Sequence, residues 1–314
     1  MSGIVVASAN GNVGIEAAIA VLRAGGSAVD AIVAGIARVE ANPDDHSVGY
    51  SGLPNLLGQV ELDASIMDGK GLRAGSVGAL HDFQDAITLA RRVMDEMPHV
   101  LLVGEGADRL GHELGLTPVD LLTPEATEIW RSRFQDLGQS GRPEDMAYYQ
   151  KIHAIVGATA SDPQMVEDVH GTVNFLAQDA AGNIACGVST SGWAWKYPGR
   201  LGDSPIIGAG NYADNRWGAA ACTGRGEMAQ RACTSHSVVT FMRFGMSVEE
   251  AVRQAMIDLR QLDDPYRSEM NIVALDKDGK PGAASSAPDK TFIYMTTGMT
   301  TWVEDTRLHV PYED

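Results

Sequence analysis

Segments with helical and strand-like patterns lie in separate blocks of this chain, and this separation limits the folds that it can adopt. Apolar residues recur at helical spacing over 15–39, interrupted at Gly25-Gly26, and again over 83–97 and 105–114. Alternating βαβ units would instead place a helix after each strand. We therefore expect an α+β fold in which helices cover antiparallel sheets.

A change of character marks the middle of the chain. The stretch 138–169 is polar and broken by prolines, which is typical of functional or mobile segments. From Thr172 onward the pattern is β, with runs at 172–178 and 184–190 on either side of a hairpin signal at 179–183. We expect further strands at 1–7, 60–67, 99–103, 206–207, 218–222, 270–275 and 291–295, and further helices at 227–244 and from Ser247.

Three of the predicted helices begin at capping residues. Ser27 and Ser247 are each followed three residues later by an acidic residue, which is the spacing of an N-cap arrangement. Thr123 precedes a proline, which is favoured at the first helical position.

Composition narrows the class of protein. With 314 residues, of which 44% are hydrophobic and 21% charged, the chain has apolar material for one large core or two small ones. A net charge of -17 argues against binding to nucleic acid or to an anionic membrane, because a polyanion would be repelled. Three cysteines without zinc-type spacing, and a start without a signal-peptide pattern, predict a cytoplasmic protein with no disulfide framework and no structural metal.

The junction Gly171-Thr172 is a candidate site of self-cleavage. A threonine hydroxyl is a weak nucleophile, and a free α-amino group on the same residue can serve as its base because the amine pKa, roughly 7.7 to 8.0, lies near neutrality. That amine exists only if the peptide bond before Thr172 is broken, and a glycine at 171 tolerates the strained backbone that the attack demands. The alternative is that Gly171-Thr172 simply opens a strand.

A glycine-rich stretch, 189–227, has the composition of a binding loop. Arg200 and Asp203 lie three residues apart beside glycines, and such a pair suits a zwitterion: a guanidinium for the α-carboxylate and a carboxylate for the α-ammonium. A surface ion pair is the alternative. Thr223 and Gly224 can present a hydroxyl and a backbone N–H to a developing oxyanion, or form a plain strand-to-helix turn.

Other motifs in the second half give weaker evidence of function. The run Gly208 to Ala213 has the form of a dinucleotide fingerprint, but no convincing helix follows it and no βαβ unit surrounds it. The histidines form no HxxxH or HExxH pattern. His170 is expected to act only in shaping the cleavage site.

Several motifs, taken in order and spacing, resemble one known family. The second half contains HGTVNFLAQDAAGNIACGVSTSG, PGRLGDSPIIGAGNYADN and ACTGRGE, and the first half contains AGGSAVDAIVAGI, SVGYSGLPN, ELDASIMDG, AGSVGAL and HVLLVGEGA. Together they resemble the N-terminal-nucleophile asparaginase family, which comprises glycosylasparaginases and isoaspartyl peptidase/L-asparaginases. The resemblance covers nearly the whole chain.

The resemblance implies a single domain over 1–314 with a four-layer αββα sandwich, cut into an α subunit, 1–171, and a β subunit, 172–314. It implies a homodimer of cleaved αβ protomers and no cofactor. On the matching positions, Thr172 is the implied nucleophile and Thr190 the threonine that supports it. The implied roles of the remaining residues are α-carboxylate binding for Arg200, α-amino binding for Asp203, and the oxyanion hole for Thr223 and Gly224.

The subfamily is less sharply indicated. SVGYSGLPN resembles the glycosylasparaginase form of that loop, where isoaspartyl peptidases carry an NAGKG-like sequence. Gly171 before the nucleophile is instead the isoaspartyl peptidase form, and the stretch 7–10 lacks the tryptophan of glycosylasparaginases.

The sequence therefore predicts an amidohydrolase acting on small β-aspartyl amides through a threonine ester, with glycosylasparaginase-type activity ahead of isoaspartyl peptidase or L-asparaginase activity. Two other classes stay open. One is a noncatalytic member of the family that binds aspartate-like ligands, and the other is a nucleotide-binding protein that uses Gly208 and Gly210.

Overall fold

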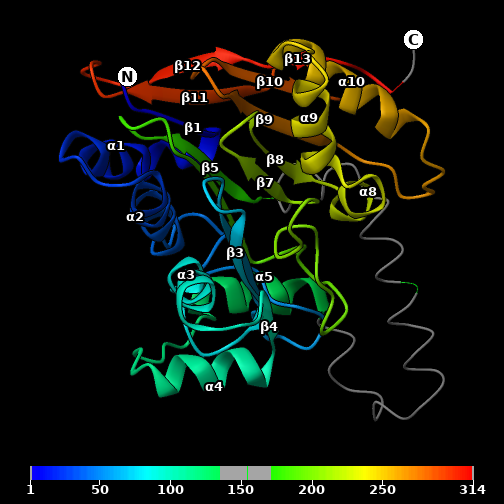
Figure 1. The fold of residues 1–314 in the computed structure, drawn as a ribbon. Helices are drawn as coiled ribbons and strands as arrows, with labels where there is room; N and C mark the ends of the chain where they lie inside the picture. Colours follow the sequence, from blue (N-terminus) through cyan, green and yellow to red (C-terminus); the bar gives the residue numbers. More distant parts are fainter. Residues whose placement is uncertain (1, 135–153, 155–170, 313–314) are drawn as a thin grey trace.

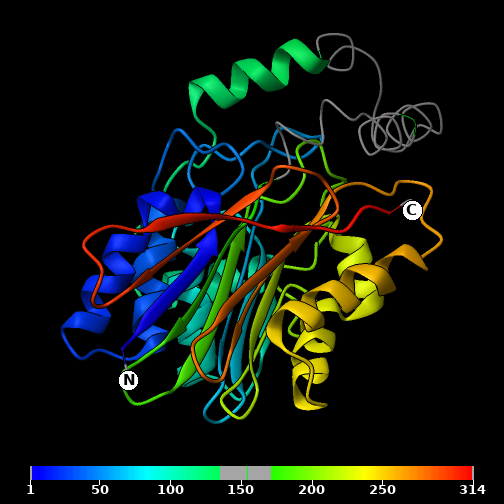
Figure 2. The same cartoon turned by 90° about the horizontal axis from the view of Figure 1, so that it is seen from above.

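Two β-sheets stacked face to face, each covered on its outer side by helices, form the body of the protein (Figure 1). The computed structural model describes residues 2–134, 154 and 171–312. Within these residues the four layers run helices, sheet, sheet, helices, and Figure 2 shows the two helical layers on opposite sides of the sheets. The expected αββα sandwich is confirmed.

The larger sheet has eight strands in the order β12-β11-β1-β5-β6-β2-β3-β4. Their bounds are β1 Ile4–Ser8, β2 Leu62–Asp68, β3 Arg73–Leu80, β4 Leu101–Val103, β5 Val173–Gln178, β6 Ile184–Thr190, β11 Thr291–Thr296 and β12 Val303–Thr306. The strands β5 and β6 lie in the middle, so the stretch after Thr172 is central to the sheet. Both are buried along their whole length, because helices cover one face and the second sheet covers the other.

The smaller sheet has five strands in the order β13-β10-β9-β8-β7. Their bounds are β7 Asn211–Asp214, β8 Gly218–Gly224, β9 Met270–Asp276, β10 Pro281–Ser285 and β13 Leu308–His309. All its pairs are antiparallel except β10 with β13. The larger sheet is likewise antiparallel except for β3 with β4, which are joined through a crossover helix. The expectation of antiparallel sheets thus fails at one edge of each sheet.

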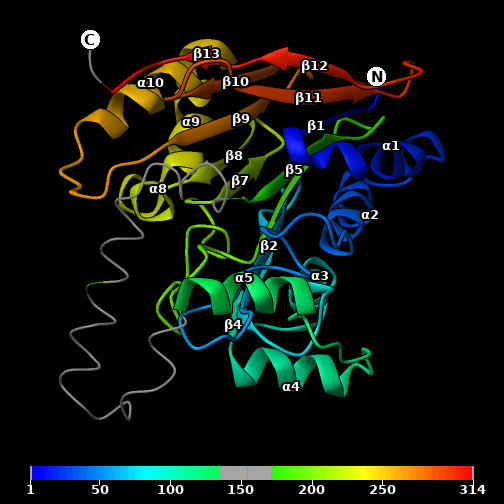
Figure 3. The same cartoon turned by 180° about the vertical axis from the view of Figure 1, so that it is seen from behind.

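Three apolar layers separate the four structural layers. One lies between the larger sheet and the first helices, one between the two sheets, and one between the smaller sheet and the later helices. The helices on the larger sheet include α1 Ile15–Arg23, α2 Ala28–Glu40 and α3 Ala86–Glu96, and those on the smaller sheet include α8 Gly226–Ala232, α9 Thr234–Arg243 and α10 Val248–Arg260. Figure 3 shows the outlying helices α4 Glu105–Glu113 and α5 Pro124–Phe134 near the end of the sandwich formed by β3 and β4.

The predicted helix starts are confirmed by their hydrogen bonds. The side chain of Ser27 accepts from the backbone N–H of Asp30 over 3.1 Å, and Ser247 forms a full capping box with Glu250. Thr123 Oγ1 accepts from the backbone N–H of Ala126, with the proline first in the helix as expected.

Three sequence predictions are wrong in detail. The expected helix 227–244 is two helices, because Cys233 adopts a left-handed conformation (φ 47°) between them. The expected strand at 206–207 is only a single bridge from Ile207 to Asn211. The strands β3, β7, β10, β12 and β13 were not expected as strands.

Across the described residues, no helix is long and apolar enough to cross a membrane. The irregular stretch 138–169 and His170 lie outside the described residues.

Candidate active site

A β-hairpin brings the predicted nucleophile and its predicted supporting threonine together. Thr172 directly precedes β5 and Thr190 ends β6, and the two strands pair with Val173 opposite Ser189. The Thr172 hydroxyl donates to Thr190 Oγ1 over 3.2 Å, and Thr190 Oγ1 donates to the carbonyl oxygen of Gly171 over 2.9 Å. The backbone N–H of Gly192 donates to Thr190 Oγ1 over 2.9 Å. Thr190 therefore links the hydroxyl of Thr172 to the carbonyl of the peptide bond before it.

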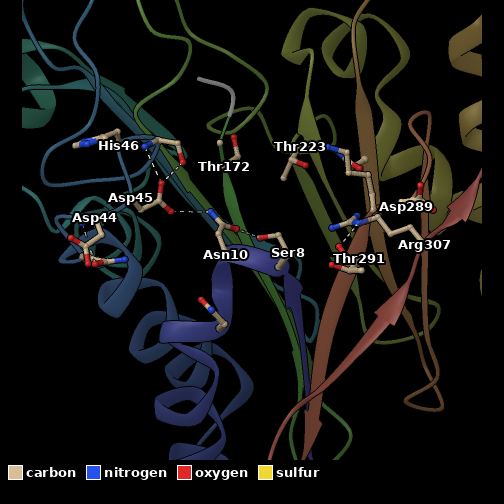
Figure 4. A pocket seen from close by; sticks show the side chains of 17 residues that line it. Ser8, Asn10, Asp44, Asp45, His46, Thr172, Thr223, Asp289, Thr291 and Arg307 are labelled. Carbon is tan, nitrogen blue, oxygen red and sulfur yellow. Dashed lines mark hydrogen bonds between the residues drawn. The ribbon is translucent and has the colours of Figure 1, made fainter. Parts of the chain in front are cut away.

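Gly171 lies in close contact with a serine from the loop after α2. A methyl group added at Gly171 would lie 1.7 Å from Ser47 Oγ, a distance that no side chain can occupy. Ser47 donates through both its hydroxyl and its backbone N–H to Asp45, whose other oxygen accepts from Asn10 (Figure 4). This network fixes Ser47, so position 171 has room only for glycine.

Arg200 is held by a carboxylate and an aromatic ring. Its Nε and Nη2 donate to the two carboxylate oxygens of Glu227, each over 3.0 Å, and its guanidinium lies 4.6 Å from the ring centre of Trp193. Arg200 therefore forms its ion pair with Glu227 rather than with Asp203. Its Nη1 has no hydrogen-bond partner among the described residues and is available to a ligand.

Asp203 is a buried carboxylate, and one of its two oxygens accepts no hydrogen bond from the described residues. Its side chain is buried, and Oδ2 has no hydrogen-bond partner in the described part of the chain. Burial raises the pKa of Asp203 to about 7, with the positive charge of Arg200 opposing that rise. An ammonium group placed at this oxygen would supply the missing partner and favour the ionised form.

Buried charged residues hold the loop that carries Arg200 in place. The backbone N–H of Gly199 donates to Glu61 Oε1 over 2.8 Å, and the buried ammonium of Lys196 donates to the carbonyl oxygen of Glu61 over 3.0 Å. Burial lowers the pKa of Lys196, while the negative charges of Asp63 and Glu61 oppose the change.

Thr223 and Gly224 are the last two residues of β8. Gly224 has φ 112° and its Cα lies so close to the backbone of β9 that an added methyl would be 2.1 Å from the carbonyl oxygen of Glu269. A small cavity of about 10 Å³ has Gly224, Thr172, Thr190, Arg200 and Asp203 among its lining residues. Five of the six residues predicted for the chemistry thus line one cavity.

Thr223 instead lines a larger cavity, of about 670 Å³, which also reaches Thr172 (Figure 4). One wall comes from the loop after α2, with Asp44, Asp45 and His46, and the opposite wall from the ends of β9, β11 and β12. Gly171 lines both cavities, so the residue before the predicted cut lies between them.

The structure argues against the dinucleotide fingerprint. The run Gly208 to Ala213 leads into β7, and β7 turns directly into β8 as a hairpin rather than into a helix. The N-terminus of α9 does reach this motif, but the backbone N–H groups of His236 and Ser235 donate to the carbonyl oxygens of Gly208 and Ala209 and are not free for a pyrophosphate.

Several residues of the site were not identified from the sequence. Ser47 lies within a motif, SVGYSGLPN, that was recognised without a role for this residue. Glu227 was given no role in the site from the sequence, and it is the partner of Arg200. Arg307 and Asn271 line the large cavity, and no local pattern marks them.

Comparison with known proteins shows the family of this chain. The family model for Asparaginase matches residues 5–304. The chain is 37% identical over 268 residues to the N(4)-(beta-N-acetylglucosaminyl)-L-asparaginase of Elizabethkingia miricola, covering 84% of this chain and 72% of the relative. It is 37% identical over 238 residues to the isoaspartyl peptidase/L-asparaginase of Mus musculus, covering 75% and 66%. It is 34% identical over 276 residues to the plant-type L-asparaginase of Pyrococcus horikoshii, covering 87% and 85%. This protein belongs to the asparaginase family.

Proposed function

We propose that this protein cuts its own chain between Gly171 and Thr172 and then uses Thr172 to hydrolyse β-aspartyl amides. The observation that carries the proposal is the meeting of Thr172, the Gly171 carbonyl, Thr190, Arg200 and Asp203 at one cavity. The names of two relatives, one a glycosylasparaginase and the other an isoaspartyl peptidase/L-asparaginase, are those of amide hydrolases and support the hydrolysis.

In the self-cleavage step, the Thr172 hydroxyl attacks the carbonyl carbon of Gly171. The C–N bond breaks and an ester to Thr172 Oγ1 forms. The proton of the hydroxyl is transferred to the departing nitrogen, which becomes the α-amine of Thr172. Thr190 donates to the carbonyl oxygen under attack and so stabilises the negative charge that develops there. Water then hydrolyses the ester and leaves a free carboxylate on Gly171.

Cleavage also makes room for a substrate. The small cavity holds about 10 Å³ in the uncut chain, which suffices for about one water molecule. Gly171 lines it, so departure of the new carboxyl terminus frees space beside Thr172.

In the hydrolysis step, the free amine of Thr172 takes the proton of its own hydroxyl, which attacks the β-carbonyl of the substrate. The leaving amine departs with a proton, and water releases aspartate from the Thr172 ester. Arg200 Nη1 binds the α-carboxylate of the substrate and Asp203 Oδ2 its α-ammonium. Thr223 and Gly224, at the end of β8, stabilise the oxyanion.

The same proposal covers the organisation of the protein. Residues 1–314 form one domain that is processed into 1–171 and 172–314, and the processed protomers pair as a homodimer. We place the protein in the cytoplasm, with the three cysteines, all free, as support for a reducing compartment.

Intact mass spectrometry of the wild-type protein beside Thr172→Ala and Thr172→Ser tests the proposal. We expect two wild-type fragments that meet at Gly171/Thr172, an uncut alanine variant, and slower but measurable cleavage of the serine variant, which keeps a hydroxyl. A wild type that stays whole and releases no aspartate from any β-aspartyl amide would instead identify a binding protein on this fold.

A further inference from the structure

Arg307 stands where the chain crosses from one sheet to the other. It follows β12, at the edge of the larger sheet, and precedes β13, at the edge of the smaller one. Its backbone N–H donates to the carbonyl oxygen of Lys290 over 2.8 Å. The crossing therefore fixes the position from which this side chain extends.

The Arg307 guanidinium is buried without a carboxylate partner. Nε donates to the carbonyl oxygen of Thr291 over 2.8 Å and Nη1 to that of Ile272 over 3.0 Å. Within the described chain it forms no ion pair, and Nη2 has no hydrogen-bond partner. The side chain is 6% exposed. Burial lowers its pKa to about 10, so the guanidinium keeps its charge at neutral pH.

This cation faces the large cavity that reaches Thr172. Figure 4 shows the Arg307 side chain extending from the link between β12 and β13 toward the cavity, across from Asp45 and His46. Asn271, opposite Thr223 in the β8–β9 ladder, lines the same wall and has a buried Oδ1 without a partner in the described chain. The wall therefore offers a desolvated positive charge beside the site of bond cleavage.

A purely structural role does not account for the charge. The two carbonyl oxygens that Arg307 binds lie on β9 and β11, so the residue ties the two sheets together. Neutral donors can serve two carbonyl oxygens, whereas a buried cation without an ion pair costs free energy. The negative charge of Glu269 offsets this cost only in part, because burial still lowers the pKa of Arg307 and Glu269 forms its ion pair with Lys290. A ligand with a negative charge would remove that cost.

We infer that Arg307 binds a carboxylate on the leaving group of the substrate, so that the preferred substrates are β-aspartyl amides of amino acids rather than neutral glycosylamides. This inference rests on the proposed hydrolysis at Thr172. The aspartyl part lies against Arg200 and Asp203, and the leaving amino acid extends from Thr172 into the cavity of about 670 Å³. That volume is far larger than ammonia requires.

A pair of substrates that differ only in this charge tests the inference. Aspartate release is measured from β-aspartyl-alanine and from its C-terminal amide, for the processed wild type, Arg307→Gln and Arg307→Lys. Arg109→Gln is the matched control, because Arg109 lies exposed on α4 and pairs only with Glu113 among the described residues. N4-glycosylated asparagine is the neutral comparison.

The wild type is expected to favour the acid over the amide by about 10- to 100-fold in kcat/KM, the range for a charge-assisted hydrogen bond. Arg307→Gln should bring this ratio close to one, mainly through a higher KM for the acid. Arg307→Lys should keep part of the preference, and Arg109→Gln all of it.

Three results would overturn the inference. A wild type that hydrolyses the amide or the glycosylated asparagine as fast as the acid has no carboxylate site, whatever the variants do. Equal losses on both substrates in Arg307→Gln, with the ratio unchanged, would show that Arg307 only ties the sheets. A processed wild type that releases aspartate from none of them refutes the proposed function and this inference with it, whereas activity with no charge preference refutes the inference alone.

Discussion

The hydroxyl of Thr190 donates to the carbonyl oxygen of Gly171 over 2.9 Å while it accepts from the hydroxyl of Thr172 over 3.2 Å. Both groups of the proposed self-cleavage therefore meet at one side chain. Thr190→Val keeps the shape but removes the donor, and we expect cleavage to slow about 10²- to 10³-fold, the usual effect of losing one oxyanion donor.

The rate of fragment formation, followed by intact mass spectrometry, measures this effect. Thr190→Ser keeps the hydroxyl and should cleave at close to the wild-type rate. Equal rates for the valine and wild-type chains would remove Thr190 from the cleavage step.

A methyl group at position 171 should obstruct cleavage by displacing the scissile peptide. In Gly171→Ala the new carbon would lie 1.7 Å from Ser47 Oγ, so either the loop or the peptide must move. We expect slower cleavage, and faster cleavage again when Ser47→Gly is added to the same chain. Gly106→Ala, where nothing lies within 4 Å of the added methyl, is the control. Failure of the double variant to recover would show that Ser47 does more than limit space.

The activity of the processed enzyme should fall on the acid side of neutrality. Asp203 has a pKa of about 7 when free, so below that pH its carboxyl is protonated and cannot pair with the substrate ammonium. The free amine of Thr172, the proposed base, must also be deprotonated, so two ionisations limit activity on the acid side. In profiles of kcat/KM from about pH 5 to 9, Asp203→Asn should be weakly active throughout and keep only the ionisation of the amine, which makes its acid limb shallower than that of the wild type. An asparagine variant with an acid limb as steep as the wild type would remove Asp203 from it.

Glu40 should make the folded state less stable as the pH rises. This residue ends α2, is fully buried, and accepts hydrogen bonds from Ile87 N and Ser189 Oγ. Burial raises the pKa of Glu40 from 4.5 to about 8, so the folded state binds one more proton than the unfolded state between these values.

The free energy of unfolding should therefore decline by on the order of 5 kcal/mol across this pH window through Glu40 alone. Glu40→Gln removes the titration. Urea unfolding of both proteins should show a difference in stability that favours the glutamine variant and grows from about pH 4.5 to 8. A constant difference would contradict the buried ionisation.

Local chemistry accounts for what the sequence predicted well. The caps at Ser27, Thr123 and Ser247 depend on residues three positions apart, so their hydrogen bonds can be read from the chain. The break at Cys233 could not be read, because a left-handed conformation is rare for residues other than glycine and nothing in the local sequence marks it. The strand β3 escaped notice because much of it is buried on both faces, and it shows no alternation of polar and apolar residues.

The residues of the candidate site also divide into those that local motifs identified and those that they did not. Thr172 and Thr190 lie on neighbouring strands of one hairpin, and the motifs around them identified both. Ser47 reaches Gly171 from the loop after α2, and Arg307 reaches the cavity from the last strand crossing. Their roles depend on contacts between segments more than 100 residues apart, or on a chain path that no local pattern records.

The strand order of the larger sheet gives a single cut at Gly171/Thr172 an unusual result. From one edge the strands come from the second fragment (β12, β11), the first (β1), the second (β5, β6) and again the first (β2, β3, β4). The two fragments would thus be interleaved along three hydrogen-bonded seams, and neither could leave without opening the sheet. Before the cut, unfolding is a reaction of one molecule; after it, refolding would require two molecules to find each other again. Heating would then become a one-way process for the mature protein, although the same contacts hold it together.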